Sequence, residues 1–254
     1  MSISLSVVII TFNEQHNIDK CLCSVEKVAN EIVVIDSFST DNTENICAKH
    51  NVTFIKNKFN GHIEQKNFAI SKASHPYILS LDADERLTNK SIQDILSVKQ
   101  KWESDAYSFK RLNNFCGHWV KYGSWYPDRK VRLFKKTAGS WQGENPHDEF
   151  ITKKEATVTS LSSDILHFTF TSISQHIKQI NYFTDISSQQ LFKKGKKSSL
   201  LKILFSPIIK FIRDYLFKLG FMDGLYGFII AYNSSHAKFQ KYTKLYFLQK
   251  NSTK

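Results

Sequence analysis

The segment Leu5-Ser6-Val7-Val8-Ile9-Ile10 is the clearest indication of the fold class. It is a continuous apolar, β-branched run, which is typical of a strand buried on both faces of a parallel sheet. Similar runs follow at 31–35, 52–56 and 77–81. Segments with helical spacing come after them, at 15–29, 41–50, 64–73 and 91–102. This alternation predicts an α/β fold with a mainly parallel, twisted sheet and flanking helices.

The order of elements changes beyond residue 104. Strand patterns at 106–111 and 130–134 enclose an aromatic loop, and further extended segments occupy 156–160 and 165–170. Helical patterns cover 172–193 and 198–218, and the second is amphipathic with a predicted interruption at Pro207. The lysine-rich stretch 193–197 marks a soft boundary. We therefore expect a ligand-binding and catalytic domain at 1–195 and a basic helical tail at 196–254.

Nearly all of the excess positive charge lies in that tail and in the lysine-rich stretch just before it. The formal net charge of the chain is +12, of which residues 191–254 carry +11. Apolar residues at 200–201, 204–205, 208–209 and 212 recur at helical spacing among the lysines. This mixture favours an anionic membrane surface over nucleic acid, and no nucleic-acid partner is expected. The same apolar stripe would also suit packing against the rest of the chain or a second subunit.

The compartment is predicted from cysteine usage and from the N-terminus. The four cysteines show no paired spacing, which fits a reduced compartment. The first residues lack the basic segment and cleavage site of a signal peptide, and no uncharged apolar run is long enough to span a bilayer. We expect a cytoplasmic protein bound peripherally to the inner face of the cell membrane.

Polar side chains follow three of the predicted strands. The strand ends read Thr11-Phe12-Asn13-Glu14, Asp36-Ser37-Phe38-Ser39-Thr40-Asp41 and Asp82-Ala83-Asp84-Glu85. Ligands of open α/β sheets bind at this carboxyl edge. Four of their acidic groups would gather there and, left alone, repel one another, so a divalent cation or a ribose is the expected complement. These four are Asp36, Asp82, Asp84 and Glu85. For Asp82 and Asp84, a solvated acidic loop is the alternative.

The first turn excludes several enzyme classes. Thr11–Glu14 has no glycine, so a pyrophosphate cannot approach the backbone there, which argues against nicotinamide and flavin enzymes. A nucleotidyltransferase is the runner-up class, but it needs a glycine-rich, basic loop at the same place. A non-catalytic membrane-surface module is the remaining alternative. A base and ribose held by Thr11, Asn13 and Asp36 fit the sequence better, although Asn13 also suits helix capping.

Taken together, these segments resemble the family-2 inverting glycosyltransferases of the GT-A fold. Later segments look like the subgroup of lipopolysaccharide-core β-glucosyltransferases, and the resemblance covers nearly the whole chain. The matching pieces are 7–14, 35–43, 65–67, 81–85, 125–134, 146–149, 166–170, 220–224 and 241–245.

The resemblance implies roles for donor-binding residues. Asp36 and Asp82 would hold the nucleoside, and Asp84 would hold a divalent cation, Mg²⁺ or Mn²⁺. Lys66 and Arg132 would face the diphosphate. For Arg132, pairing with Asp128 or a neighbouring carboxylate is the alternative. The further expected donor contacts are Thr11, Asn13, Glu14 and Ser37.

An inverting enzyme needs one general base, which removes the proton of the acceptor hydroxyl. The subgroup carries a His-Glu pair where this chain has His147-Asp148. We assign the base to Asp148, with Glu149 as the alternative and a polar turn as the non-functional interpretation. His147 is expected at the acceptor.

Two further features leave alternatives open. His167 lies in a strand pattern, where it is either a hydrogen-bonded core residue or a further metal ligand. Trp125 and Tyr126 belong to an aromatic cluster that would either bind the acceptor sugar or pack in the core. The resemblance implies transfer of a hexose, glucose from UDP-glucose, from a nucleotide-sugar donor to a glycolipid acceptor, either the lipopolysaccharide core or another cell-envelope glycan.

Overall fold

A computed structural model describes residues 3–144 and 147–252 of the chain. They form two compact units. Unit 1 comprises Met1–Arg111 and Asp128–His167, and unit 2 comprises Leu112–Pro127 and Phe168–Lys254. These units group residues 168–195 with the C-terminal helices. A functional division at residue 195 stays a prediction.

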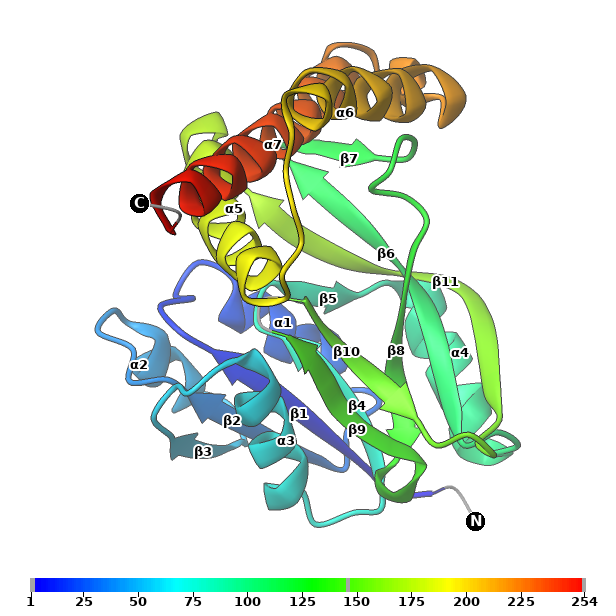
Figure 1. Cartoon of the computed structure of the whole chain (residues 1–254). Helices are drawn as coiled ribbons and strands as arrows, with labels where there is room; N and C mark the ends of the chain where they lie inside the picture. Colours follow the sequence, from blue (N-terminus) through cyan, green and yellow to red (C-terminus); the bar gives the residue numbers. More distant parts are fainter. Residues whose placement is uncertain (1–2, 145–146, 253–254) are drawn as a thin grey trace. The chain divides into compact units, whose positions relative to one another are not determined.

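Unit 1 is built on a mixed sheet (Figure 1). Its first half is parallel, in the order β3-β2-β1-β4, and antiparallel pairing begins at β8. The α/β prediction is therefore confirmed, with parallel pairing confined to the first four strands. The strands of unit 1, two of which continue into unit 2, are β1 (Leu5–Thr11), β2 (Glu31–Asp36), β3 (Thr53–Lys56), β4 (Tyr77–Asp82), β5 (Glu85–Leu87), β6 (Ala106–Phe115), β8 (Asp128–Lys135), β9 (Gly139–Glu144), β10 (His147–Thr152) and β11 (Val158–Phe170).

Helices cover both faces of this sheet, as Figure 1 shows for α1 and α3. On one face, α1 (Ile18–Val25), α2 (Thr43–Cys47) and α4 (Asn89–Gln100) bury their apolar sides against β1, β4, β6 and β8. On the other, α3 (His62–Lys72) and the β9–β10 hairpin pack against residues such as Val8, Val33 and Phe134. Burial on both faces explains why the central strands are continuously apolar.

Several elements differ from the sequence prediction. The segment after Asp84 forms the short strand β5, which pairs with β11. The segment of Asp148, for which a polar turn is the non-functional interpretation, belongs to the β9–β10 hairpin. The two extended segments at 156–170 are one strand, β11, and the aromatic loop contains β7 (His118–Val120). These pairings are long-range, so local periodicity does not reveal them.

Unit 2 is mainly helical. Its helices are α5 (Ile173–Lys193), α6 (Leu200–Ile212), the π-helical turn η2 (Arg213–Phe217), η3 (Gly220–Asp223) and α7 (Gly224–Ser252). Figure 1 shows α7 lying along α5 and α6, in agreement with their contacts. Lys244 of α7 binds Asn181 Oδ1 of α5 at 2.8 Å. A side chain at Gly227 would collide with the Gly220 carbonyl, so α7 can approach η3 only without one.

The predicted interruption at Pro207 is wrong, because α6 runs through it without a break. Proline removes one helical donor, but packing against α7 holds the helix, and Ser235 Oγ donates to the Pro207 carbonyl at 2.8 Å. Among the described residues, none of the helices has both the length and the apolar character needed to cross a bilayer.

Candidate active site

The first two strand ends are joined by side chains rather than by glycine-rich backbone. Asn13 has a left-handed backbone, with φ 55°. Its backbone N–H donates to Ser39 Oγ at 2.8 Å, and its side-chain oxygen accepts from the backbone N–H of Thr40 at 2.8 Å. Asn13 therefore connects the turn after β1 to the turn after β2. The helix-capping alternative for Asn13 does not hold, because Asn17 is the residue that precedes α1.

Asp36 and Thr11 lie deep at this edge. Asp36 is fully buried, and its two oxygens accept from the backbone and hydroxyl of Ser39 at 2.8 and 2.5 Å. Thr11 is also buried, and its hydroxyl has no hydrogen-bond partner among the described residues. Ser37 accepts from Gln65 Nε2 at 3.1 Å. The edge thus offers one unsatisfied hydroxyl beside a carboxylate that its own loop already holds.

Lys66 links two predicted site residues from different parts of the chain. It extends from α3, and its Nζ lies 3.0 Å from Asp82 Oδ1 and 2.7 Å from Asp148 Oδ2. The same nitrogen lies 4.3 Å from the centre of the Trp141 ring. Lys66 is almost fully buried. It therefore connects the end of β4 to the hairpin that carries Asp148.

Arg132 neutralises the other side of the acidic edge. Its Nη2 lies 2.5 Å from Glu85 Oε1 and 3.1 Å from Asp82 Oδ2, and its side chain is buried. Burial alone would raise the pKa of Asp82, but Lys66 and Arg132 outweigh it and hold that pKa well below its usual range. Cations of the chain itself therefore balance the charges of Asp82 and Glu85.

Asp84 and His167 form a separate pair at the same edge. His167 is the register partner of Glu85 in the β5–β11 ladder, which brings it next to Asp84. Its Nε2 lies 3.1 Å from Asp84 Oδ2, and both side chains are partly exposed. A carboxylate oxygen and an imidazole nitrogen this close can bind one divalent cation. The arrangement fits the predicted metal ligands.

Glu14 lies close enough to Asp84 and His167 for their charges to affect its pKa. Its Oε2 accepts from Asn17 Nδ2 at 2.8 Å. Burial raises the pKa of Glu14 to about 7, with further upward contributions from Asp84 and Asp41. A carboxyl group with that pKa is partly protonated at neutral pH. A cation at Asp84 would favour its ionised form.

The two base candidates face opposite sides of β10. Asp148 and Glu149 are neighbours in the strand, so their side chains alternate. Asp148 turns inward to Lys66 and is mostly buried, whereas Glu149 is exposed. This geometry brings Asp148 to the charged edge. The side chain of His147 lies outside the described part of the structure.

The two aromatic candidates belong to unit 2. Trp125 packs edge to face on Phe115 and His176, with ring centres 5.6 and 5.4 Å apart, and it contributes to the core of that unit. Burial lowers the pKa of His176 to about 4, so its ring is neutral at physiological pH. Core packing therefore accounts for the contacts of Trp125. Tyr126 follows it in the chain and is half-buried.

Sequence reasoning missed two supports of the site. Asn67 exchanges two hydrogen bonds with the backbone of Trp141, at 2.9 and 3.0 Å, and so fixes the β9–β10 hairpin to α3. Arg111 binds Asp128 Oδ2 at 2.7 Å and lies 3.8 Å from Glu85 Oε1. Asn67 stands next to Lys66 in a motif that the sequence already singles out. The sequence does not indicate the β9–β10 hairpin, so the role of Asn67 could not be predicted from it.

Comparison with known proteins gives consistent results. The family model described as "Glycosyl transferase family 2" matches residues 6–157. An uncharacterized glycosyltransferase of Rickettsia typhi is 28% identical over 95% of this chain and 86% of its own length. The lipopolysaccharide core biosynthesis glycosyltransferase LpsC of Rhizobium meliloti is 28% identical over 95% of this chain and 92% of its own.

Among solved structures, S. aureus TarS 1-349 superposes with a TM-score of 0.49 at 15% identity, covering 98% of this chain and 92% of that one.

Proposed function

Since the chain belongs to glycosyl transferase family 2 and transfers glycosyl groups with a GT-A fold, we propose that it is an inverting, metal-dependent hexosyltransferase. The donor is a nucleotide sugar, UDP-glucose. The acceptor is a glycolipid, the lipopolysaccharide core or another cell-envelope glycan. The likeness to LpsC over nearly the whole length of both chains supports this choice of acceptor.

The observation that carries the proposal is the charged edge of the sheet. Lys66 joins Asp82 to Asp148, while Asp84 faces His167 at 3.1 Å. Two cationic side chains, Lys66 and Arg132, thus belong to one unit with a candidate cation-binding pair and a carboxylate base. Transfer from a nucleoside diphosphate donor to an acceptor hydroxyl can use all three kinds of group.

Asp84 would hold the divalent cation, with His167 as a further ligand. The bound ion would neutralise charge that develops on the departing diphosphate. The donor set of oxygen and imidazole nitrogen suits Mn²⁺, and Asp84 alone suits Mg²⁺. Glu14, with its raised pKa, would complete the negative surroundings as it ionises.

The base is Asp148. The acceptor oxygen forms a bond to the anomeric carbon while the bond from that carbon to the diphosphate oxygen breaks. Asp148 takes the proton of the acceptor hydroxyl, and the electron pair of the broken bond leaves with UDP. Attack from the face opposite the leaving group inverts the anomeric configuration. The ion pair with Lys66 fixes the position of the Asp148 carboxylate before the acceptor arrives.

The remaining side chains bind the donor. Lys66 and Arg132 lie on either side of Asp82 and would face the diphosphate when it enters. The buried Thr11 hydroxyl would gain a partner from the nucleoside, together with Asn13, Ser37 and Asp36. Trp125, Tyr126 and His147 are proposed acceptor contacts.

The tail would bring the enzyme to its acceptor. Residues 196–254 contain a row of exposed apolar side chains on α6 with lysines among them, and we propose that this row lies on the anionic inner face of the cell membrane. Its most exposed members are Leu200, Leu201, Leu204 and Ile209.

The experiment that tests the activity measures nucleotide release from a panel of UDP-, GDP- and CMP-sugars, with Mn²⁺ or with EDTA, and with a purified lipopolysaccharide core lacking its terminal hexose. We expect release from UDP-glucose only with both metal and acceptor, and a β-linked glucose in the product. Release without metal, or a product that retains the donor's anomeric configuration, would contradict the proposal.

A further inference from the structure

A second cluster of metal-ligating side chains lies away from the carboxyl edge. Asp19 and Cys23 stand four residues apart on α1, so they share one face of the helix. His50 comes from the turn between α2 and β3. One ligand atom from each of these three residues lies within 4.8 Å of the others. An oxygen, a sulfur and a nitrogen thus meet from two elements that are distant in sequence.

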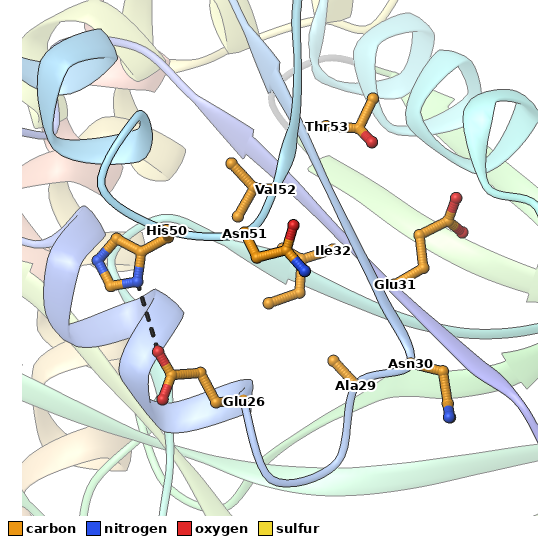
Figure 2. A pocket seen from close by; sticks show the side chains of 9 residues that line it. All are labelled: Glu26, Ala29, Asn30, Glu31, Ile32, His50, Asn51, Val52 and Thr53. Atoms are coloured by element: carbon orange, nitrogen blue, oxygen red, sulfur yellow. Dashed lines mark ion pairs between the residues drawn. The ribbon is translucent and has the colours of Figure 1, made fainter.

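The position of this cluster separates it from the proposed active site. His50 and Glu26 line a pocket together with the residues that begin β2 and β3, including Ile32 and Thr53 (Figure 2). The pocket therefore lies at the amino ends of these strands, whereas Asp36 and Asp84 lie at the carboxyl ends. The cluster has no part in the chemistry proposed above.

His50 is oriented by carboxylates on both ring nitrogens. Its Nε2 lies 3.0 Å from Asp19 Oδ1, and its Nδ1 lies 3.4 Å from Glu26 Oε1, the pair drawn dashed in Figure 2. The His50 side chain is mostly buried, whereas Asp19 and Glu26 are exposed and free to adjust. A carboxylate on the second nitrogen is the usual way in which proteins fix the ring of a metal-binding histidine.

We propose that Asp19, Cys23 and His50 bind a zinc ion, with Glu26 orienting His50 and a water in the fourth position. Thiolate and imidazole ligands select zinc over magnesium or calcium. Two ligand atoms of a tetrahedral zinc site, with bonds near 2.0 Å, are separated by about 3.3 Å. The 3.0 Å between Asp19 and His50 is already close to that value.

The charge of the cluster suits a cation. Asp19 and Cys23 face His50 from α1, and Glu26 faces it from the residue that follows this helix. The Cys23 side chain is exposed. Slight desolvation and the charges of Asp19 and Glu26 raise the pKa of its thiol, so zinc must displace a proton to bind it. Without metal, the ring of His50 would simply bridge the two carboxylates, which is the alternative explanation for its position. A bound zinc would instead link α1 to the α2–β3 turn.

Cobalt titration of the reduced, full-length protein tests the proposal, because a thiolate ligand gives Co²⁺ a charge-transfer absorption band. We expect this band in the wild type and its removal by added Zn²⁺. Cys23→Ser should abolish the band, and His50→Gln should weaken binding at least about 10-fold. Cys116→Ser is the matched cysteine control, and Asp84→Ala is the control for the carboxyl edge. Both should keep the band.

Zinc should also raise the melting temperature of Asp84→Ala, which lacks the proposed cation ligand of the carboxyl edge, and leave that of the double variant Asp84→Ala with Cys23→Ser unchanged. Circular dichroism in EDTA establishes that each variant is folded. A wild type without the thiolate band, or a Cys23→Ser variant that retains it, would overturn the proposal. His50 would then serve only as an ionic bridge.

Discussion

Two aspartates separated by one residue have different surroundings in this protein. Asp82 is held between Lys66 and Arg132, and its pKa is depressed as a result. Asp84 instead faces the imidazole of His167 and is a quarter exposed. We infer that Asp82 organises the cationic side chains of the site, while Asp84 is positioned to take up a cation.

Asp148→Asn should abolish transfer, because the amide cannot accept the acceptor's proton. We expect kcat to fall at least about 100-fold with KM for the donor little changed. Steady-state kinetics with Glu149→Gln as the matched control measures this. The control should keep most of its activity, since Glu149 lies on the other side of β10 and is exposed. A fully active Asp148→Asn enzyme would transfer the role to Glu149.

Glu14 makes the stability of the metal-free protein depend on pH. Burial, and to a smaller extent Asp84 and Asp41, raise the pKa of Glu14 from 4.5 to about 7. The folded state therefore holds a proton that the unfolded state releases, so this group lowers stability as pH rises from about 4.5 to 7. Above pH 7 the loss is complete.

Glu14→Gln removes this penalty and should stabilise the protein by about 1–3 kcal/mol at pH 8, with little difference from the wild type at pH 4.5. Urea unfolding of both proteins in EDTA across this range gives the difference. Equal stability at pH 8, or a gain at acid pH alone, would contradict the assigned pKa.

At the scale of elements, the β9–β10 hairpin completes the site. It brings Asp148 to Lys66 and the Trp141 ring beneath the Lys66 ammonium. Asn67 fixes the hairpin through two hydrogen bonds to the Trp141 backbone. The position of the base thus depends on a side chain that touches no reacting group.

Asn67→Ala should lower the free energy of unfolding by about 1–3 kcal/mol, because the buried backbone groups of Trp141 lose both partners. Activity should fall as well, through a displaced Asp148. Chemical unfolding and turnover at saturating donor measure both effects. Gln142→Ala, an exposed neighbour on the same hairpin, should change neither. An unchanged stability in Asn67→Ala would show that apolar packing alone holds the hairpin.

The parallel half of the sheet could be predicted because each of its strands carries its own signal. The runs at 5–10, 31–35 and 77–81 are buried on both faces and need no knowledge of their partners. β5 could not be predicted in this way, since three residues become a strand only by pairing with β11. The same limit applies to the hairpin.

The candidate site also contains residues that could be predicted from local sequence and contacts that depend on long-range strand pairing. The carboxyl-edge residues were predictable, because strand ends determine which side chains meet. The pairing of Arg132 with Glu85 was not, since it depends on the antiparallel β8 next to β4. The prediction from the sequence therefore included too much unbalanced negative charge at the carboxyl edge, because it did not pair Arg132 with Asp82 and Glu85. It also left His167 undecided, which the β5–β11 register places beside Asp84.

At the scale of the whole molecule, one unit carries the candidate chemistry and the other carries a large apolar surface. α6 and η2 expose Leu201, Ile209 and Phe217, which are 67%, 65% and 80% accessible. Lys202 is exposed on the same helix, whereas Lys210 is mostly buried in an ion pair with Asp214. Exposed apolar patches of this kind mark interaction surfaces, and Lys202 favours anionic lipid.

Leu201→Glu combined with Ile209→Glu should reduce binding to phosphatidylglycerol vesicles by about 10-fold or more, because both side chains would leave the lipid and repel its charge. Flotation of the full-length protein measures this, with phosphatidylcholine vesicles for comparison. Tyr182→Glu is the matched control, since Tyr182 is equally exposed but lies on α5. Unchanged flotation of the double variant would contradict the proposed membrane surface.

A cation-dependent donor site can be measured by calorimetric titration with UDP, with and without Mn²⁺. We expect the wild type to bind UDP at least about 10-fold more tightly with Mn²⁺, and Asp84→Ala to lose this enhancement while remaining folded. Equal binding of UDP with and without the metal, or an Asp84→Ala variant that keeps the full enhancement, would contradict a cation-dependent donor site at the carboxyl edge of the sheet.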